Sequence, residues 1–464
     1  MATAVEIDLS KYSHIHFIGI GGISMSGLAE ILLHNGFKVS GSDIQTSPLV
    51  KKLESKGAII YIGHSGDNIK DVDLVVYTAA VKEDNEELIC SRKRNIPTIE
   101  RAKFLGTIMQ HYKKSIAVSG THGKTTTTSM ISIILDQANF DPTILVGGEL
   151  DNIGGNVRVG KSPYFITEAC EYVESFLYFT PYIGIILNIE EDHLDYFTDI
   201  EHIKKAFYKF AKLIPQHGLL IAKGDSENIA SILKDLNCTI VTFGTSDHCD
   251  WQAKNISFDG MGLGSFDAFY EGENIGHFKL SVPGDHNIIN SLSAIACAYY
   301  LDIPISTIRD GLRLYKGTHR RFELKGKIKN ISVIDDYAHH PTEIKATLSA
   351  ANRIPHRKLW CVFQPHTYTR TLTLLDEFAT AFQMADEVIL ADIYAAREKD
   401  QGLIHSKDLE AAINKAGQRA NYLGDFQSIL SHLCSRVQPE DLVITMGAGN
   451  IDQVGNLFLI ELAK

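Results

Sequence analysis

Several features that mark large protein classes are missing from this sequence, and each absence excludes a class. No apolar run approaches the roughly 18 residues that a membrane-spanning helix needs. The first residues, Met1 to Lys11, lack a basic stretch followed by an apolar one, so we expect no secretory signal. The seven cysteines show no Cys-x-x-Cys spacing, which argues against a disulfide framework or a zinc ribbon. We therefore expect a cytoplasmic protein.

An excess of basic residues is also absent, since the formal net charge is −11. Such a charge disfavours non-specific binding to nucleic acid or to an anionic membrane, and we expect neither partner. If the substrates are phosphates, local cations, metal ions and backbone N–H groups must offset the global repulsion. A chain of 464 residues, 44% of them hydrophobic, predicts a globular α/β protein of about three domains.

The chain opens with alternating short strands and helices, the pattern of a doubly wound sheet. An apolar run at 14–19 predicts a strand, helical spacing follows at 25–35, and a second strand is predicted at 38–43. Further strands are predicted at 58–62, 74–78 and 98–99. We expect a first, Rossmann-like domain over residues 1–105.

Two further α/β domains are predicted. The central one, residues 106–315, has a strand at 115–119 that runs into a Gly-rich loop, so we expect a P-loop ATPase with a mostly parallel sheet. Its other elements are predicted as strands at 164–168, 183–188 and 218–222, helices at 125–138 and 287–301, and loops or antiparallel strands at 247–276. The C-terminal domain, residues 316–464, is again predicted to be Rossmann-like. Its strands are predicted at 332–337, 358–363, 387–392 and 441–446, and its helices at 341–351, 372–384 and 407–415.

The strongest chemical signal is a phosphate-binding loop at a strand–helix junction. It consists of Gly120, Thr121, His122, Gly123, Lys124, Thr125 and Thr126. Its glycines let backbone N–H groups approach phosphate oxygens, Lys124 adds charge for the β- and γ-phosphates, and Thr125 offers a hydroxyl to Mg²⁺. The general pattern has a glycine where this chain has Val118. A plain glycine turn is the competing interpretation, but the Gly-Lys-Thr-Thr run stands where the chemistry needs it.

A second Gly-rich turn, Gly19-Ile-Gly-Gly-Ile-Ser24, follows the first strand and opens the first helix. Its position is that of a dinucleotide-binding turn. Asp43, at the end of the second predicted strand, stands where an acidic residue would meet a ribose or a nearby group of a nucleotide. Binding of NAD, and a turn that binds no nucleotide, are the competing interpretations.

Acidic residues and a histidine gather in a turn just after the strand predicted at 183–188. The segment reads Asn188-Ile189-Glu190-Glu191-Asp192-His193-Leu194-Asp195. Hard oxygen ligands and an imidazole suit a divalent cation near phosphates. Glu168, at the end of another predicted strand, is a candidate partner ligand. An ordinary acidic loop is the competing interpretation.

Three charged segments of the C-terminal domain fall at strand ends or linkers. They are His319-Arg320-Arg321-Phe322-Glu323, Asp335-Asp336-Tyr337-Ala338-His339-His340-Pro341, and Gln364-Pro365-His366-Thr367-Tyr368-Thr369-Arg370. Arginine suits phosphoryl groups and carboxylates because its planar fork binds oxyanions through two hydrogen bonds. Taken singly, the segments read equally well as surface charge and helix capping. Together they indicate a third domain that serves a phosphate site.

These motifs, in this order, resemble the Mur ligases of peptidoglycan synthesis. The likeness covers nearly the whole chain and is greatest to the ligases that join L-alanine to UDP-N-acetylmuramate. It rests on residues 19–22, 40–43, 120–126, 191–195, 285–290, 320–323, 335–341 and 364–366. The departure at Val118 matches the form of the loop in this family.

The resemblance implies an N-terminal domain for the UDP-sugar, a central ATPase and a C-terminal domain for the amino acid. It implies the use of ATP and Mg²⁺, and the ligation of L-alanine through an acyl phosphate. The partners would then be small-molecule substrates, and we expect a monomer or a homodimer.

The resemblance also implies roles for particular residues. The UDP diphosphate would be held by Gly21, Gly22, Ile23 and Ser24, with Asp43 and His64 nearer the uridine. ATP would be met by the phosphate loop with Lys124, by His286 and Asn290 at the adenine, and by Arg321 and Asp336. Mg²⁺ would be held by Thr125, Glu168 and His193, and the amino-acid site would be lined by Tyr337, His339 and Arg370. The expected catalytic residues are Lys124, His193, Arg321, Asp336, His339 and Arg370.

The chain departs from the family at two positions. Cys170 stands where many relatives have Asp, and Thr367 stands where they often have Arg. Arg370 is therefore the better candidate to bind the amino acid's carboxylate. Several ligases of the superfamily carbamoylate a lysine to bridge metal ions; no lysine is assigned that role here, and Lys209 is only a nearby candidate.

Three other functions remain open at this point. A nicotinamide-dependent dehydrogenase would use the first Gly-rich turn but would leave the phosphate loop unexplained. A switch-like nucleotide binder would use the phosphate loop without any ligation. Within the superfamily, the murein tripeptide ligases are the nearest rival.

Overall fold

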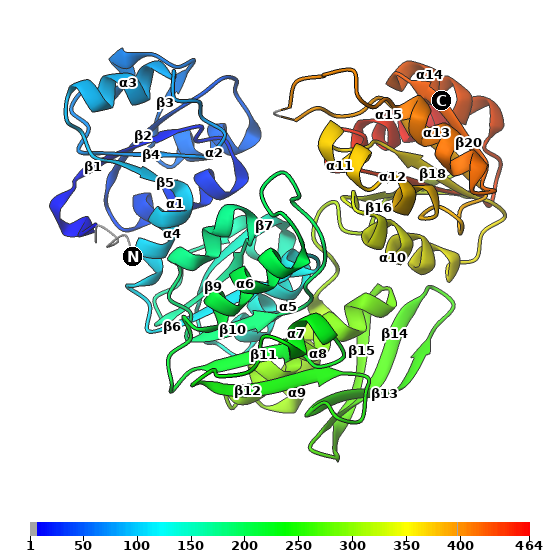
Figure 1. Cartoon of the computed structure of the whole chain (residues 1–464), viewed down its shortest axis with the longest axis horizontal. Coiled ribbons are helices and arrows are strands. Elements are labelled where there is room, and N and C mark those ends of the chain that lie inside the picture. Colours follow the sequence, from blue (N-terminus) through cyan, green and yellow to red (C-terminus); the bar gives the residue numbers. More distant parts are fainter. Residues whose placement is uncertain (1–6, 397) are drawn as a thin grey trace. The chain divides into compact units, whose positions relative to one another are not determined.

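The computed structural model describes residues 7–396 and 398–464 (Figure 1). The described chain is α/β, with three sheets that are mostly parallel. It divides into two compact units. The first contains the chain up to Ile189, Ile203–Thr242 and Ala296–Ile303, and the second contains Glu190–His202, Phe243–Ile295 and Pro304–Lys464. The part of the predicted N-terminal segment that precedes residue 7 lies outside the described residues, and the domain boundaries near 105 and 315 stay predictions.

The first sheet has five parallel strands in the order β3-β2-β1-β4-β5. They are β1 (His14–Ile18), β2 (Lys38–Asp43), β3 (Ile59–Ile62), β4 (Leu74–Tyr77) and β5 (Thr98–Glu100). Its helices are α1 (Ile23–His34), α2 (Pro48–Ser55), α3 (Glu86–Lys93) and α4 (Arg101–Met109), with 3-10 turns η1 (Leu9–Lys11) and η2 (Gly66–Ile69). Every residue of the central strand β1 is buried, as expected where both faces of a parallel sheet are covered. The predicted doubly wound arrangement is confirmed.

The larger sheet runs within the first unit in the order β12-β11-β10-β6-β9-β7-β8. The strands are β6 (Lys114–Ser119), β7 (Thr143–Leu150), β8 (Gly155–Arg158), β9 (Tyr164–Ala169), β10 (Ile183–Ile186), β11 (Leu219–Lys223) and β12 (Thr239–Gly244). The other elements are α5 (Lys124–Gln137), α6 (Ile200–Ala211), α7 (Glu227–Ala230), η3 (Asp151–Ile153) and η4 (Tyr172–Tyr178). Because β6 pairs in parallel with β10 and β9, the loop that follows it emerges between two neighbouring strand ends.

The second unit contains an antiparallel meander, whose strands belong to the same ten-stranded sheet as β12, and a separate, mostly parallel sheet. The meander is β13 (Trp251–Phe258), β14 (Leu263–Tyr270) and β15 (Glu273–Pro283), so the region predicted as loops or antiparallel strands is antiparallel. The C-terminal sheet has the order β16-β17-β21-β18-β19-β20, with β16 alone antiparallel among these strands. Its strands are β16 (Glu323–Ile328), β17 (Ile331–Asp336), β18 (Leu359–Phe363), β19 (Glu387–Ala391), β20 (Ala420–Gly424) and β21 (Leu442–Met446). The longer helices are α8 (Asp285–Tyr300), α9 (Ile305–Leu314), α10 (Pro341–Asn352), α13 (Ser406–Lys415), α14 (Phe426–Arg436) and α15 (Asp452–Ala463).

The core of the C-terminal sheet lies on both of its faces. Cys361 and Phe363 of β18 belong to one apolar cluster, whereas Trp360 and Val362 belong to another. Successive residues of a strand point to opposite faces, so the sheet is covered on both sides. No helix of the described residues is both long and apolar enough to cross a membrane.

The helix predicted at 372–384 is wrong. The chain instead forms two short helices, α11 (Tyr368–Thr373) and α12 (Leu375–Ala379). Thr367 caps α11 by accepting a hydrogen bond from the Arg370 amide, which starts the helix earlier than the apolar spacing indicates. At Leu374 the backbone leaves the helical region (φ −103°, ψ 25°), and the helix divides there.

Gly106 of α4 offers a test of packing in the first unit. A Cβ at this position would lie 2.1 Å from the carbonyl oxygen of Tyr178 in η4. Although alanine favours helices, we expect Gly106→Ala to destabilise the protein by about 1–3 kcal/mol, because backbone atoms must move apart. Thermal unfolding of the purified variant measures this. Gly260→Ala, where a Cβ meets no atom within 4 Å, is the matched control, and equal melting temperatures for the two variants would contradict the packing.

Candidate active site

The Gly-rich turn after β1 is tied to the end of β2 by Asp43. Asp43 Oδ2 accepts a hydrogen bond from the Gly21 amide at 2.8 Å, and a Cβ on Gly21 would lie 2.8 Å from the same oxygen. Glycine, which has no Cβ, is suited to so close an approach. Gly22 is the N-cap of α1, so Ile23 and Ser24 form its first turn. Backbone N–H groups at such a helix start are suited to bind a diphosphate.

The phosphate loop has its glycines where the backbone requires them. Gly120 (φ +141°) and Gly123 (φ +84°) occupy conformations that favour glycine. A Cβ on Gly120 would also approach Leu187 Cβ to 3.0 Å. Val118, by contrast, is a fully buried residue of β6. The position where the general motif has its first glycine is therefore part of the strand, which explains the departure.

Asn188, just after β10, holds the loop from the neighbouring strand. Its Oδ1 accepts from the His122 amide at 2.8 Å, and its Nδ2 donates to the His122 carbonyl at 3.1 Å. The Asn188 carbonyl accepts from the Thr121 amide at 3.3 Å. These contacts position the backbone N–H groups of the loop. The sequence placed Asn188 only at the start of the segment predicted to bind a cation. Its part in holding the loop was not predicted, although its place at a strand end beside β6 was a signal for it.

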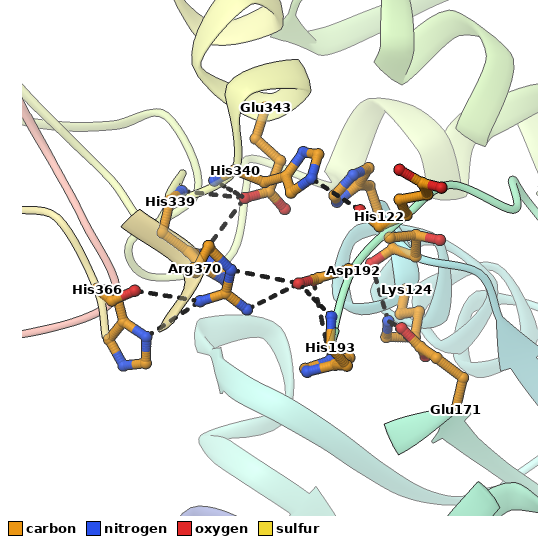
Figure 2. Close-up of polar contacts among 12 residues, drawn as sticks. His122, Lys124, Glu171, Asp192, His193, His339, His340, Glu343, His366 and Arg370 are labelled. Atoms are coloured by element: carbon orange, nitrogen blue, oxygen red, sulfur yellow. Dashed lines mark hydrogen bonds and ion pairs between the residues drawn. The ribbon is translucent and has the colours of Figure 1, made fainter. Parts of the chain in front are cut away.

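Lys124 is paired within the first unit. Its ammonium donates to both carboxylate oxygens of Glu171, at 3.0 and 3.2 Å, and to the carbonyls of Gly120 and Thr121 (Figure 2). Burial opposes the charged form, but Glu171 outweighs it and the pKa of Lys124 is raised. Glu171, which is 2% exposed, therefore fills the position beside the Lys124 ammonium that a phosphate oxygen would otherwise fill. Burial raises the pKa of the adjacent Cys170 thiol to about 11, so this residue is neutral and cannot replace a carboxylate.

Two residues of the predicted metal set lie together. Thr125 Oγ1 donates to Glu168 Oε2 at 3.0 Å, and Glu168 Oε1 accepts from the Gly147 amide at 2.6 Å. A hydroxyl and a carboxylate are the hard oxygen donors that Mg²⁺ prefers, so this pair fits the ion. A Cβ on Gly147 would come within 2.8 Å of Glu168, which accounts for that glycine. His193, the third predicted ligand, belongs to the second unit.

Asp336 ends β17 in the second unit and is buried. Its oxygens accept from the amides of Phe322 and Ala338, at 2.8 and 2.7 Å. Burial raises the pKa of Asp336 to about 7, against the opposing positive charge of Arg321. The carboxyl is therefore close to half-protonated at neutral pH and can gain or release a proton there.

The Tyr337 ring lies near two guanidinium groups. The central carbons of Arg320 and Arg321 are each 5.1 Å from its centroid, within the range of cation–π attraction. Arg320 is held by Asp335 at 3.0 Å and by the carbonyls of Gly447 and Gly449. Sequence reasoning placed Arg321 and Tyr337 in the site, and the structure brings them together.

Arg370 binds a carboxylate in the second unit. Its Nη2 and Nε donate to Asp192 Oδ1 at 2.9 and 3.2 Å, and its Nη1 lies 3.2 Å from His366 Nδ1 (Figure 2). Burial favours the neutral acid, but the Arg370 guanidinium holds the pKa of Asp192 far below its usual range. The arginine fork thus binds an anionic carboxylate of the protein itself, and its role toward the amino acid stays a prediction. Asp192 was predicted only as one of the acidic residues of a cation-binding turn; here it is paired with Arg370, and the adjacent His193 amide donates to its Oδ1 at 2.7 Å.

The two histidines before α10 differ in function. His340 caps the helix, with its ring accepting from the Thr342 amide. His339 Nδ1 lies 2.9 Å from the Tyr337 carbonyl, and burial lowers the pKa of His339 to about 4. Since a carbonyl only accepts, Nδ1 carries the proton of this neutral ring and Nε2 is an acceptor. Two further predicted residues, His286 and Asn290, lie four residues apart on α8 and so share one face.

Models of one family match three successive parts of the chain. The model described as "Mur ligase family, catalytic domain" matches residues 14–113, "Mur ligase middle domain" matches 118–298, and "Mur ligase, glutamate ligase domain" matches 320–449. The chain belongs to the Mur ligase family.

Curated relatives and solved structures agree with this assignment. A UDP-N-acetylmuramate–L-alanine ligase of Acetivibrio thermocellus is 58% identical over 98% of this chain and 97% of its own length. The crystal structure of UDP-N-acetylmuramate–alanine ligase from Thermotoga maritima has a TM-score of 0.83 at 30% identity, covering 97% of this chain and 99% of that one. A murein peptide ligase from Psychrobacter arcticus has a TM-score of 0.74 at 28% identity, with the same coverage.

The pKa of Asp336 offers a test of the second unit's electrostatics. We expect the carboxyl carbon of Asp336, followed by ¹³C NMR, to titrate near pH 7 in the nucleotide-free protein, with Asp336→Asn identifying its signal. Because the Arg321 charge favours the ionised form, Arg321→Met should move the midpoint higher, whereas Arg321→Lys should move it less. A midpoint near 4 in the wild-type protein would show that the carboxyl is not desolvated.

Proposed function

We propose that this chain is an ATP-dependent ligase that joins L-alanine to the lactyl carboxylate of UDP-N-acetylmuramate in peptidoglycan precursor synthesis. The observation that carries the proposal is the phosphate loop, with Lys124 and the Thr125–Glu168 pair in place. This loop occurs in a chain that is 58% identical, over nearly its whole length, to a ligase of that name.

The reaction explains why a phosphate loop is needed. A carboxylate does not condense with an amine in water, so the lactyl carboxylate first attacks the γ-phosphorus of ATP. That step forms an acyl phosphate and releases ADP. The neutral amine of L-alanine then attacks the acyl carbon, phosphate leaves, and the amine loses a proton as the amide forms. Since both carboxylate and ATP are anionic, the site must supply positive charge.

Positive charge in the first unit comes from Lys124 and from the loop amides. When ATP binds, Lys124 releases the Glu171 carboxylate and contacts the β- and γ-phosphates instead. The loop amides positioned by Asn188 face the same phosphates. Thr125 and Glu168 would hold Mg²⁺, which when bound offsets charge on the phosphates. No covalent enzyme nucleophile is required by this chemistry.

In this proposal, each of the three predicted domains binds a different substrate. Residues 1–105 bind the UDP-sugar, 106–315 bind ATP and 316–464 bind the amino acid; the limits of the three matching family models support this division. In the first domain the diphosphate lies at the start of α1, and in the central one the adenine lies near His286 and Asn290. Arg321 and Asp336 serve the nucleotide.

Recognition of the amino acid is assigned to Arg370, Tyr337 and His339. Arg370 already binds the Asp192 carboxylate through two nitrogens, and the same fork would accept the carboxylate of L-alanine. Neutral His339, with its Nε2 as an acceptor, suits a position near the amine. Thr367, the N-cap of α11, supplies no second guanidinium here.

The decisive experiment is an ADP-release assay. We expect ADP to form only when ATP, Mg²⁺, UDP-N-acetylmuramate and an amino acid are all present, with L-alanine preferred in a panel that includes serine, glycine and the free murein tripeptide. An excess of chelator should stop the reaction. Preference for the tripeptide would instead favour the function named for the Psychrobacter arcticus structure. ATP turnover without an amino acid would reject ligation.

Lys124→Ala isolates the contribution of the loop. We expect ligation to fall about 100-fold or more, because the transferred phosphoryl group loses a buried cation, while UDP-N-acetylmuramate binds as in the wild-type protein. Initial rates and calorimetric titration measure the two properties. Lys212→Ala, an exposed lysine of the same unit, is the control and should keep full activity. Retained ligation by Lys124→Ala, or loss of UDP-sugar binding, would refute the role of Lys124.

A further inference from the structure

A buried polar network crosses the first sheet and is not used by the proposed reaction. Its centre is Glu87 of α3, whose side chain is 0% exposed. Glu87 Oε2 accepts from Ser42 Oγ of β2 at 2.6 Å, and Oε1 accepts from Asn68 Nδ2 of η2 at 2.8 Å. His16 Nε2 of β1 lies 3.5 Å from Oε1. Burial opposes ionisation, but these neighbours outweigh it and lower the pKa of Glu87, so the network holds a carboxylate.

The exposed end of this network is His64. Its Nδ1 lies 3.0 Å from Glu87 Oε2 and 3.0 Å from Ser42 Oγ. Because the carboxylate only accepts and the Ser42 hydroxyl donates to that carboxylate, Nδ1 carries a proton. Within the described part of the chain, both hydrogen-bond contacts of the His64 ring are made by Nδ1. Its side chain is 25% exposed, and Nε2 is left for a ligand.

The loop that carries His64 is joined to the Gly-rich turn. The Gly63 amide donates to the Asp43 carbonyl at 2.7 Å, and Asp43 Oδ2 accepts from the Gly21 amide. Ser42, which contacts both His64 and Glu87, directly precedes Asp43 on β2. His64 therefore lies at the same strand ends as the turn that is proposed to bind the diphosphate, and Glu87 lies behind it.

Burying an ionised carboxylate in a protein core costs free energy. Its desolvation must be offset by several donors, and an apolar side chain would stabilise the sheet at least as well. A carboxylate that fixes a histidine in one tautomer and one orientation, however, is a recurrent means of directing the other ring nitrogen at a ligand. His64 fits this pattern, because the fully buried Glu87 carboxylate lies on one side of its ring and the other side is accessible to solvent.

We propose that Glu87 is the positioning residue of the UDP-sugar site, fixing His64 through Nδ1, with Ser42, so that His64 Nε2 meets the uridine end of the ligand. The inference rests on the proposed function, which assigns UDP-sugar binding to residues 1–105. Glu87 does not touch the ligand; it acts through His64. Loss of Glu87 and loss of His64 should therefore remove one and the same interaction.

A double-mutant cycle on the full-length protein tests this coupling. We expect His64→Ala and Glu87→Gln each to raise the Kd for UDP about tenfold in calorimetric titration, near the upper end of the effect of losing one hydrogen bond between uncharged groups. The double variant should bind no more weakly than His64→Ala, and KM for the UDP-sugar should follow the same order. Additive effects would mean that Glu87 only stabilises the fold, and would overturn the inference.

Further variants keep the test decisive if Glu87→Gln fails to fold. Ser42→Ala removes the hydroxyl that touches both partners, and its weakening of UDP binding should vanish in the His64→Ala background. His64→Gln keeps an amide near the Nε2 position and should bind UDP more tightly than His64→Ala. The reverse result in either comparison overturns the inference.

A matched control separates stability from binding. Asp73 is a second carboxylate of the first sheet, and it accepts from Ser13 and the His14 amide. Asp73→Asn should lower the melting temperature but bind UDP as the wild-type protein does, whereas a tenfold loss there would make the Glu87 effect nonspecific. Failure of the wild-type protein to bind either UDP or UDP-N-acetylmuramate would refute the proposed function itself, a result distinct from additivity in the cycle.

Discussion

A buried carboxylate must be met by donors, and this constraint shapes the functional part of each unit. Glu168, which is half-buried, is held by Thr125 and the Gly147 amide, and the buried Glu171 is held by Lys124. Asp192 forms an ion pair with Arg370. The donors around Asp336 do not fully offset the cost of burying its negative charge, and its pKa is therefore raised. The acids fall at or near strand ends because backbone amides and loops that can supply donors converge there.

The sequence predicted the site best at positions where the backbone conformation and the chemistry require the same short run of residues. Gly120 and Gly123 are glycines because of positive φ, and Lys124 follows directly, so a short local pattern predicts both the turn and its ligand. The same holds for Gly21, which must leave room for Asp43. The α/β class followed from alternating apolar segments, since the strands of parallel sheets are buried along their length.

What the sequence did not reveal depends on contacts between distant segments. Nothing in the local sequence predicts that Asn188 binds the backbone of His122 or that Glu171 pairs with Lys124; the fold brings these residues together. Glu87 lies in a helix, 23 residues from His64, and no local spacing links them. The helix predicted at 372–384 failed for the opposite reason: the local cap at Thr367 and the break at Leu374 overrode an apolar periodicity that looked continuous.

The Lys124–Glu171 pair has a consequence for how the protein meets its nucleotide. A lysine already neutralised at 3.0 Å contributes little to the long-range field, and the chain as a whole carries a net charge of −11. Encounter with an anion is therefore not accelerated by attraction at a distance. Selection happens on contact instead, because an arriving anion displaces Glu171 only if it offers Lys124 and the loop amides a better set of acceptors.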